Sequence, residues 1–256
     1  MAICSRSSTV SSPEHIHPAL WRGTRLARPA GPVLGTGHPA LDNELPGLGW
    51  PLGALIECLL PHNGSGELQL LKPALQQLSL SRRIALLDPP MPPNIQCLSN
   101  WEINEQHVLC IHTRSAGNLV WAAQLLLQHN TCGALLCWAP SLRPAALRQL
   151  QLAARHSTTL FVVLRPLSAA RTASAAPLRL ALAPHPNGLM LHIVKRAGPL
   201  HDRPLLLCLN DDAGHAFPAC PGGHPSATQA TMPGPSPALA PSLARGASPA
   251  SSAVTG

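Results

Sequence analysis

Residues 55–71 have the sequence LIECLLPHNGSGELQLL, in which an apolar run is followed by a glycine-containing turn and then by leucines at helical spacing. This order predicts a buried strand, a turn and a helix, which is the layout of a phosphate-binding loop. Backbone N–H groups at the start of such a helix form a ready anion site. We therefore expect the shape of a nucleotide site at Asn63, Gly64, Ser65 and Gly66.

The residues that carry the chemistry of a nucleotide site are missing from this turn. An active loop has the pattern G-x-x-x-x-G-K-[ST], in which Lys reaches the β- and γ-phosphates and the hydroxyl holds Mg²⁺. If Gly66 is the second glycine, Glu67 and Leu68 stand in those places. Glu67 reverses the charge and Leu68 cannot bind a metal, so we expect no nucleotide and no other cofactor. We interpret Glu67 as a structural carboxylate at the helix N-terminus rather than as a catalytic base.

The composition indicates one sizeable domain with tails. The chain has 256 residues, 45% of them hydrophobic, which is enough for a core. Only 11% are charged, against roughly 25% in typical soluble proteins. A core-rich, charge-poor protein tends to need a partner or a low copy number to stay soluble. The net charge of +7 permits contact with nucleic acid. Because the arginines are scattered, we expect that DNA contact is weak or indirect.

The cysteines predict neither disulfides nor a metal site. The eight cysteines include no C-x-x-C pair, and Cys132 and Cys137 lie in an apolar run that predicts buried free thiols. Other cysteines and histidines share a low-complexity region, at spacings that fit no common zinc pattern: Cys208, Cys220, His201, His215 and His224.

Both ends of the chain differ from its middle. Residues 1–30 are interpreted as a flexible leader, in which Trp21, Arg22 and Arg25 are candidate partner contacts. Residues 211–256 are rich in Ala, Pro, Ser and Gly, and we expect disorder there because too few bulky apolar residues offset the ordering entropy. No stretch approaches the roughly 18 apolar residues of a membrane span. These features favour a cytoplasmic protein without membrane contact.

Strands and helices alternate over residues 31–210, and this alternation predicts an α/β fold. Asn187-Gly188 is typical of a hairpin turn and predicts an antiparallel pair of strands at the end of the domain. The other strands are expected to be largely parallel, with helices on their faces. The expected strands are 55–60, 83–88, 108–112, 133–138, 158–164, 178–183 and 189–194, and the longer helices begin near Glu67, Ser115 and Leu142.

Between Val33 and Leu209 the sequence resembles the RecA ATPase core. The order and spacing of several short stretches carry the resemblance: 35–37, 41–42, 47–53, 56–57, 84–88 and 133–138. A narrower set resembles ImuA, a RecA-like accessory protein of bacterial mutagenesis cassettes that is related to the division inhibitor SulA: 64–68, 71–75 and 161–166. The resemblance implies a RecA-like mostly parallel sheet flanked by helices.

The chain departs from RecA where catalysis takes place. Pro89 and Pro90 follow Asp88, where RecA has a catalytic Glu, and Trp138-Ala139-Pro140 stands where a metal-binding Asp closes the Walker B strand. Losing one such element typically costs orders of magnitude in rate. We therefore expect that the chain has no catalytic residue and is not an enzyme, which argues against an active recombinase-type ATPase.

The resemblance implies a role in SOS-induced translesion DNA synthesis. The expected partners are an ImuB-type polymerase-like protein and an error-prone DNA polymerase, with the RecA filament as a further candidate. By analogy with RecA assembly, Arg143 and Arg148 on an exposed helix face are candidate contacts, together with the leader. The alternative is a SulA-type inhibitor of cell division that acts on FtsZ, and the RecA-like segment 33–53 favours the adaptor.

Overall fold

The computed structural model describes residues 31–198 and 203–209. These residues belong to the first of two compact units, 1–212 and 213–256. The leader with Trp21, Arg22 and Arg25, and the tail from 211 that we expect to be disordered, lie outside the described residues.

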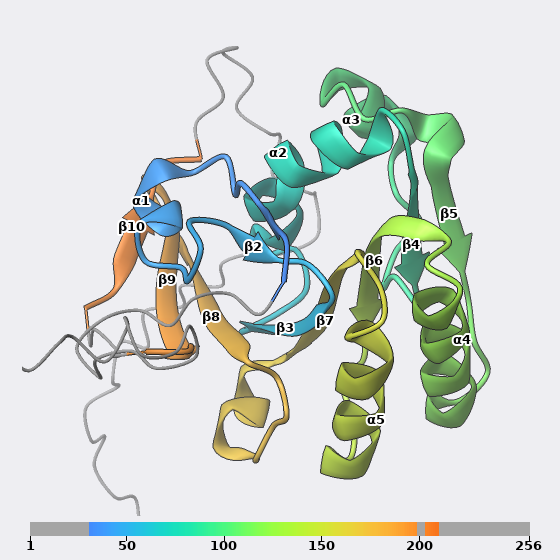
Figure 1. Ribbon diagram of the computed structural model, residues 1–256. Helices are drawn as coiled ribbons and strands as arrows, with labels where there is room; N and C mark the ends of the chain where they lie inside the picture. The colour runs from blue at the N-terminus through green and yellow to red at the C-terminus, as the bar shows by residue number, and fades with distance from the viewer. Residues whose placement is uncertain (1–30, 199–202, 210–256) are drawn as a thin grey trace, which may run out of the picture. The chain divides into compact units, whose positions relative to one another are not determined.

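A mixed sheet of eight strands forms the centre of the described part of the chain (Figure 1). Its order is β10-β9-β8-β3-β7-β6-β4-β5, with parallel pairing from β8 to β5. The predicted hairpin is confirmed, because β9 pairs antiparallel with β8, and β10 then pairs antiparallel with β9. The α/β fold predicted from the sequence is therefore confirmed. The strands are β3 (Ala54–Leu60), β4 (Arg83–Leu87), β5 (Val108–Ile111), β6 (Cys132–Trp138), β7 (Leu160–Pro166), β8 (Leu178–His185), β9 (Gly188–Lys195) and β10 (Leu205–Leu207).

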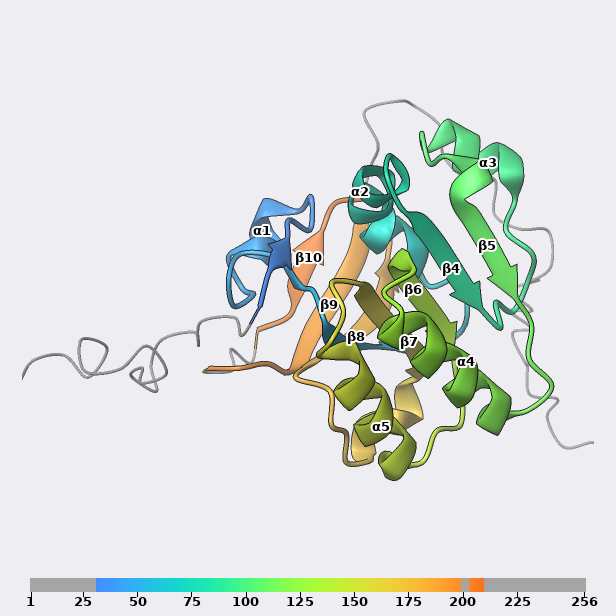
Figure 2. The same cartoon turned by 45° about the vertical axis from the view of Figure 1, so that its right-hand side comes forward.

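Helices cover both faces of this sheet. In Figure 2, α4 and α5 lie side by side on one face and α2 lies on the other. The two faces accordingly hold separate groups of buried apolar side chains, one with α2 and one with α4 and α5. The helical segments are α1 (Pro39–Asp42), α2 (Glu67–Ser79), α3 (Ile95–Asn100), α4 (Ala116–Gln128), α5 (Pro144–Ala154) and the 3₁₀ turns η2 (Glu105–His107) and η3 (Leu167–Arg171).

Local signals set the starts of α4 and α5. Ser115 caps α4, as predicted, because its hydroxyl accepts the N–H of Asn118 at 3.2 Å. Helix α5 begins at Pro144, two residues later than the sequence predicted. Arg143 is extended there, and Pro144 fits the first helical position because its missing N–H would have had no partner.

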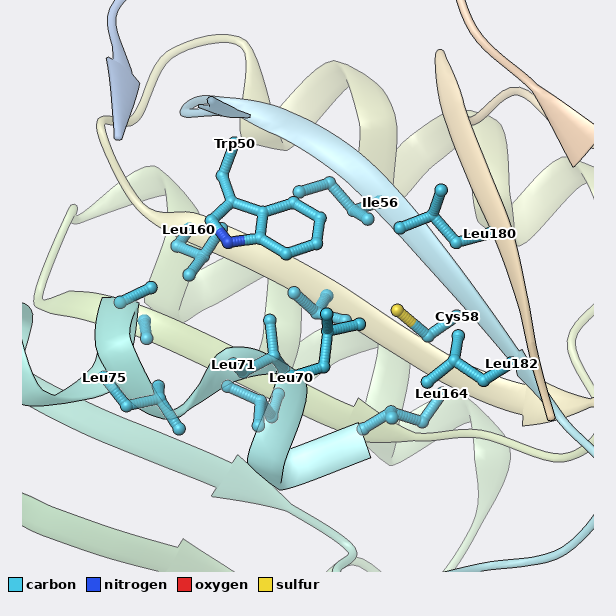
Figure 3. Packing of buried hydrophobic residues seen from close by; sticks show 14 of the residues in the cluster. Trp50, Ile56, Cys58, Leu70, Leu71, Leu75, Leu160, Leu164, Leu180 and Leu182 are labelled. Carbon is cyan, nitrogen blue, oxygen red and sulfur yellow. The ribbon is translucent and has the colours of Figure 1, made fainter. Parts of the chain in front are cut away.

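The segment before β3 is part of the core. It forms a two-stranded sheet of β1 (Val33–Leu34) and β2 (Trp50–Pro51) and carries α1. Leu41, Leu45 and Trp50 are fully buried. Figure 3 shows the Trp50 ring against side chains of the sheet and α2, with Ile56 and Leu160 nearby. Residues 33–53 are therefore held by the same apolar cluster as the sheet.

Candidate functional site

The predicted phosphate loop is a turn between β3 and α2 that depends on two glycines. Gly64 and Gly66 have φ of 80° and 96°, a region that side chains with a Cβ rarely adopt. Gly66 is the N-cap of α2, and a Cβ added to it would lie 3.2 Å from Leu189 Cδ1 of β9. The strand, turn and helix predicted for 55–71 are therefore present.

A side chain of the protein occupies one of the backbone N–H donors of this turn. The Gly64 N–H donates to Glu67 Oε1 at 2.8 Å, and Glu67 is only 3% exposed. Its second oxygen, Oε2, has no hydrogen-bond partner among the described residues. The carboxylate thus places a negative charge inside the turn, where a nucleotide would place a phosphate.

Ser65 and Cys58 beside this turn are buried rather than poised for reaction. The Ser65 hydroxyl donates a hydrogen bond to the carbonyl of His62 in the same turn. The residue Ser65 is only 2% exposed. Burial, together with the negative charges of Glu67 and Glu57, raises the pKa of the Cys58 thiol to about 12. Cys58 therefore stays a thiol at neutral pH, and a thiol is a poor nucleophile.

A buried ionic network crosses the centre of the sheet, and no sequence motif pointed to it. Glu57 on β3 is fully buried. Arg165 on β7 donates from Nη1 to Glu57 Oε1 at 2.7 Å, and Arg179 on β8 donates from Nε to Glu57 Oε2 at 2.5 Å. Arg179 also donates to the carbonyls of Ala169 and Ala170 in η3. Every oxygen of the carboxylate is thus paired with an arginine.

The register of the sheet brings these three charges together. Glu57 lies opposite Val163 on β7 and Arg179 on β8. Arg165 follows Val163 by two residues and so lies on the same face of the strand. The sequence did contain a signal for this network, because Glu57, Arg165 and Arg179 each interrupt an otherwise apolar run. A buried charge needs a partner of opposite charge, so these residues could have been expected to pair.

A crevice of about 680 Å³ lies beyond the carboxyl ends of the parallel strands. In α/β sheets this edge is where ligands usually bind. Asp88 at the end of β4 has φ of 51°, and its carboxylate accepts both the N–H and the hydroxyl of Thr113. Other lining residues come from β3, β6 and β7, from the turn after β3, and from the loops before α4 and α5: Leu60, His62, Asn63, Arg114, Trp138, Ser141, Leu142, Leu164 and Arg165.

The structure brings only some of the predicted site residues together. Asn63 to Glu67 form one turn, but within that turn only Asn63 lines the crevice. Arg143 and Arg148 are exposed on or beside α5 and do not line the crevice. The predicted buried free thiols Cys132 and Cys137 are confirmed.

Two apolar side chains on α4 face solvent. Trp121 is 65% exposed and Leu125, one helical turn later, is 40% exposed. We call these two residues the α4 patch. They lie opposite the buried stripe of Leu119, Ala123 and Leu127. The sequence carried this signal, because a tryptophan outside the inner stripe of an amphipathic helix has no place in the core.

The described residues contain no group of three or more His, Cys, Asp or Glu side chains arranged to hold a metal ion. Cys208 is described and exposed, while the neighbours considered with it lie outside the described ranges. No helix in the described part of the chain is long and apolar enough to cross a membrane.

Comparisons with known proteins do not show a family for this chain. No protein-family model matches the sequence, and no curated protein matches it either. Among solved structures, the chain is similar to SulA from Pseudomonas aeruginosa, with 23% identity, 43% of this chain and 97% of that chain covered, and a TM-score of 0.37. The residues themselves therefore carry the functional argument.

The filled turn leads to a prediction about nucleotide binding. Titration of the chain with a non-hydrolysable ATP analogue and Mg²⁺ in a calorimeter should give no measurable heat of binding, because Glu67 repels phosphate and already uses the Gly64 N–H. The variant E67K/L68S restores the residue types of the active pattern, and E67Q is its control without the new charge. Micromolar affinity in the unchanged chain would contradict the prediction.

Proposed function

We propose that this chain is a non-catalytic, RecA-like accessory protein of SOS-induced translesion DNA synthesis and acts as an adaptor for an ImuB-type polymerase-like partner. The observation that carries the proposal is the bond from Gly64 N–H to Glu67 in the phosphate loop. An internal carboxylate at the place of a phosphate suits a fold that keeps its shape without turning over nucleotide. The resemblance to ImuA supplies the process and the further partners, an error-prone polymerase and the RecA filament.

The α4 patch supports binding to a protein partner. Exposed tryptophan is enriched among residues that dominate interface energies, and Trp121 projects from a helix beside α5, which carries Arg148. Apolar anchors with nearby arginine are typical of protein interfaces. Leader residues Trp21, Arg22 and Arg25, and Arg143 immediately before α5, remain further candidate contacts of this cytoplasmic adaptor.

The test is damage-induced mutation frequency in a strain that lacks the gene, with cell length scored in parallel. The adaptor role predicts a fall in induced mutation with normal filamentation. Unchanged mutation with loss of filamentation would instead favour the SulA-type inhibitor of FtsZ. Complementation with the unchanged gene should restore mutation, which ties the effect to this chain.

The variant W121S/L125S then tests the α4 patch. We expect its affinity for the purified ImuB-type protein to fall by roughly 30-fold or more, which is the effect of losing an interface hot spot, and induced mutation to fall with it. The control is L80S, because Leu80 is 77% exposed but lies at the end of α2. Equal partner binding by both variants would rule out the α4 patch as the contact.

A further inference from the structure

The buried network around Glu57 carries an excess positive charge. One carboxylate faces two arginines, and all three side chains are at most 7% exposed. Of the two arginines only Arg165 lines the crevice at the carboxyl ends of the strands. Since a buried charge is stable only when it is paired, the crevice is the place where a negative charge from outside would complete the network.

Arg165 also keeps an unused donor. Its Nη1 donates to Glu57 and its Nη2 to the carbonyl of Leu142 at 3.2 Å, but its buried Nε has no partner among the described residues. The indole N–H of Trp138, which lines the same crevice, is likewise buried without a partner there. Buried donors without a partner are rare in native proteins, and a bound ligand or ion is one way in which they are satisfied.

The shape and lining of the crevice indicate the size of its ligand. About 680 Å³ lies within the range of roughly 300–1,000 Å³ typical of small-molecule sites and far exceeds what one inorganic ion fills. Leu60 and Leu164 line it from the α2 side of the sheet, and Leu119 and Leu142 line it from the α4 and α5 side. These apolar walls suit an organic body.

The charged groups around the crevice leave Arg165 as the best anchor. Asp88 opposes an anion, and the hydrogen bonds that its two oxygens accept from Thr113 fix its orientation without removing its charge. Arg114, also on the wall, is exposed and adds a second positive charge. Of the phosphate loop only Asn63 lines this crevice, and Gly64 to Glu67 do not, so the crevice adjoins the loop but is not enclosed by it.

We infer that the crevice beyond the carboxyl ends of β3, β4, β6 and β7 binds a small organic anion, an apolar body with one carboxylate or phosphate, and that Arg165 holds its charge. A carboxylate or a phosphate pairs with a guanidinium through charge-assisted hydrogen bonds. This site is independent of the α4 patch, so the binding of small anions and the binding of a protein partner can fail separately.

The experiment is a calorimetric titration of the full chain with benzoate, phenyl phosphate and the neutral analogue benzyl alcohol. Benzoate and phenyl phosphate each join an apolar ring to one anionic group. Their relative affinities decide whether the site prefers a carboxylate or a phosphate. We expect one anion or both to bind at least about tenfold more tightly than benzyl alcohol, as a charge-assisted hydrogen bond provides, and to bind more weakly as salt is raised. Equal affinity for the neutral analogue, or no binding of either anion at millimolar concentration, would overturn the inference.

The variant Arg165→Gln tests the anchor. Arg179 still pairs with Glu57 in this variant, so the carboxylate is not left alone. We expect a loss of anion affinity of about tenfold or more, while binding of benzyl alcohol is unchanged. Arg83→Gln is the matched control, because Arg83 is exposed at the opposite end of β4.

A second variant keeps the inference testable if Arg165→Gln does not fold. Arg114→Gln changes an exposed wall residue and should weaken anion binding severalfold without affecting thermal unfolding. Unchanged anion affinity in a folded Arg165→Gln variant would overturn the assignment. If that variant is unfolded, unchanged affinity in Arg114→Gln together with a lack of salt dependence in the original chain would overturn it.

Discussion

The substitution Glu57→Gln is expected to lower the free energy of unfolding by about 3–5 kcal/mol, which is the usual effect of removing one partner from a buried ion pair. Glu57 is fully buried, and both of its oxygens accept from arginines. The glutamine has nearly the same shape, so the change removes charge and leaves Arg165 and Arg179 buried without a counter-ion. Urea denaturation of the two proteins, followed by circular dichroism, measures the difference.

Two controls separate the loss of charge from other effects. Glu102→Gln makes the same change at an exposed position and should alter stability by less than about 0.5 kcal/mol. Replacing Glu57, Arg165 and Arg179 together by Leu or Met should recover much of the lost stability, because well-packed apolar groups often match a buried ion network. A Glu57→Gln protein as stable as the Glu102→Gln protein would show that the network does not stabilise the fold.

Trp50→Ala is expected to cost about 3–5 kcal/mol of stability, which is the range for deleting a large buried aromatic side chain. Trp50 is fully buried and belongs to the cluster that includes Ile56, Leu70 and Leu160 (Figure 3). Its loss leaves a cavity and also releases residues 33–53 from the sheet. Thermal unfolding of the variant, combined with limited proteolysis of that segment, measures both effects.

Trp50→Phe is the matched comparison. The indole Nε1 of Trp50 has no hydrogen-bond partner among the described residues. Replacing the ring by phenylalanine therefore breaks no hydrogen bond to a described residue, and it removes a buried unpaired donor. We expect this variant to lose less than half as much stability as Trp50→Ala. Equal losses would mean that the ring is held by its N–H rather than by its packing.

Sequence patterns of local origin predicted most of the parallel sheet. The apolar run 133–138 became the buried strand β6, Asn187-Gly188 formed the tip of the β8–β9 hairpin, and Ser115 capped α4. Each of these signals acts over a few neighbouring residues, through burial on both faces of a strand, turn conformation or a capping hydrogen bond. The sequence also showed directly that Glu67 and Leu68 replace the Lys and Ser/Thr of an active phosphate loop.

The small N-terminal sheet, strand β10 and the depth of Trp50 were not predicted. β1 and β2 have two residues each, and β10 has three. Segments this short carry too little periodicity to be recognised. They are stable because they pack on a larger structure, so their conformation depends on neighbours from elsewhere in the chain.

The sequence by itself determined the type of each long element, the shape of the turn at Gly64 to Gly66 and the absence there of the Lys and Ser/Thr of an active nucleotide site. Only the tertiary structure decided that Glu57 meets Arg165 and Arg179, which lie 108 and 122 positions away, and that several strand ends enclose one crevice. The physical reason is that local sequence sets the conformation of each segment. The lateral order of the strands, which places β7 and β8 on either side of β3, comes from burying both faces of the whole sheet at once.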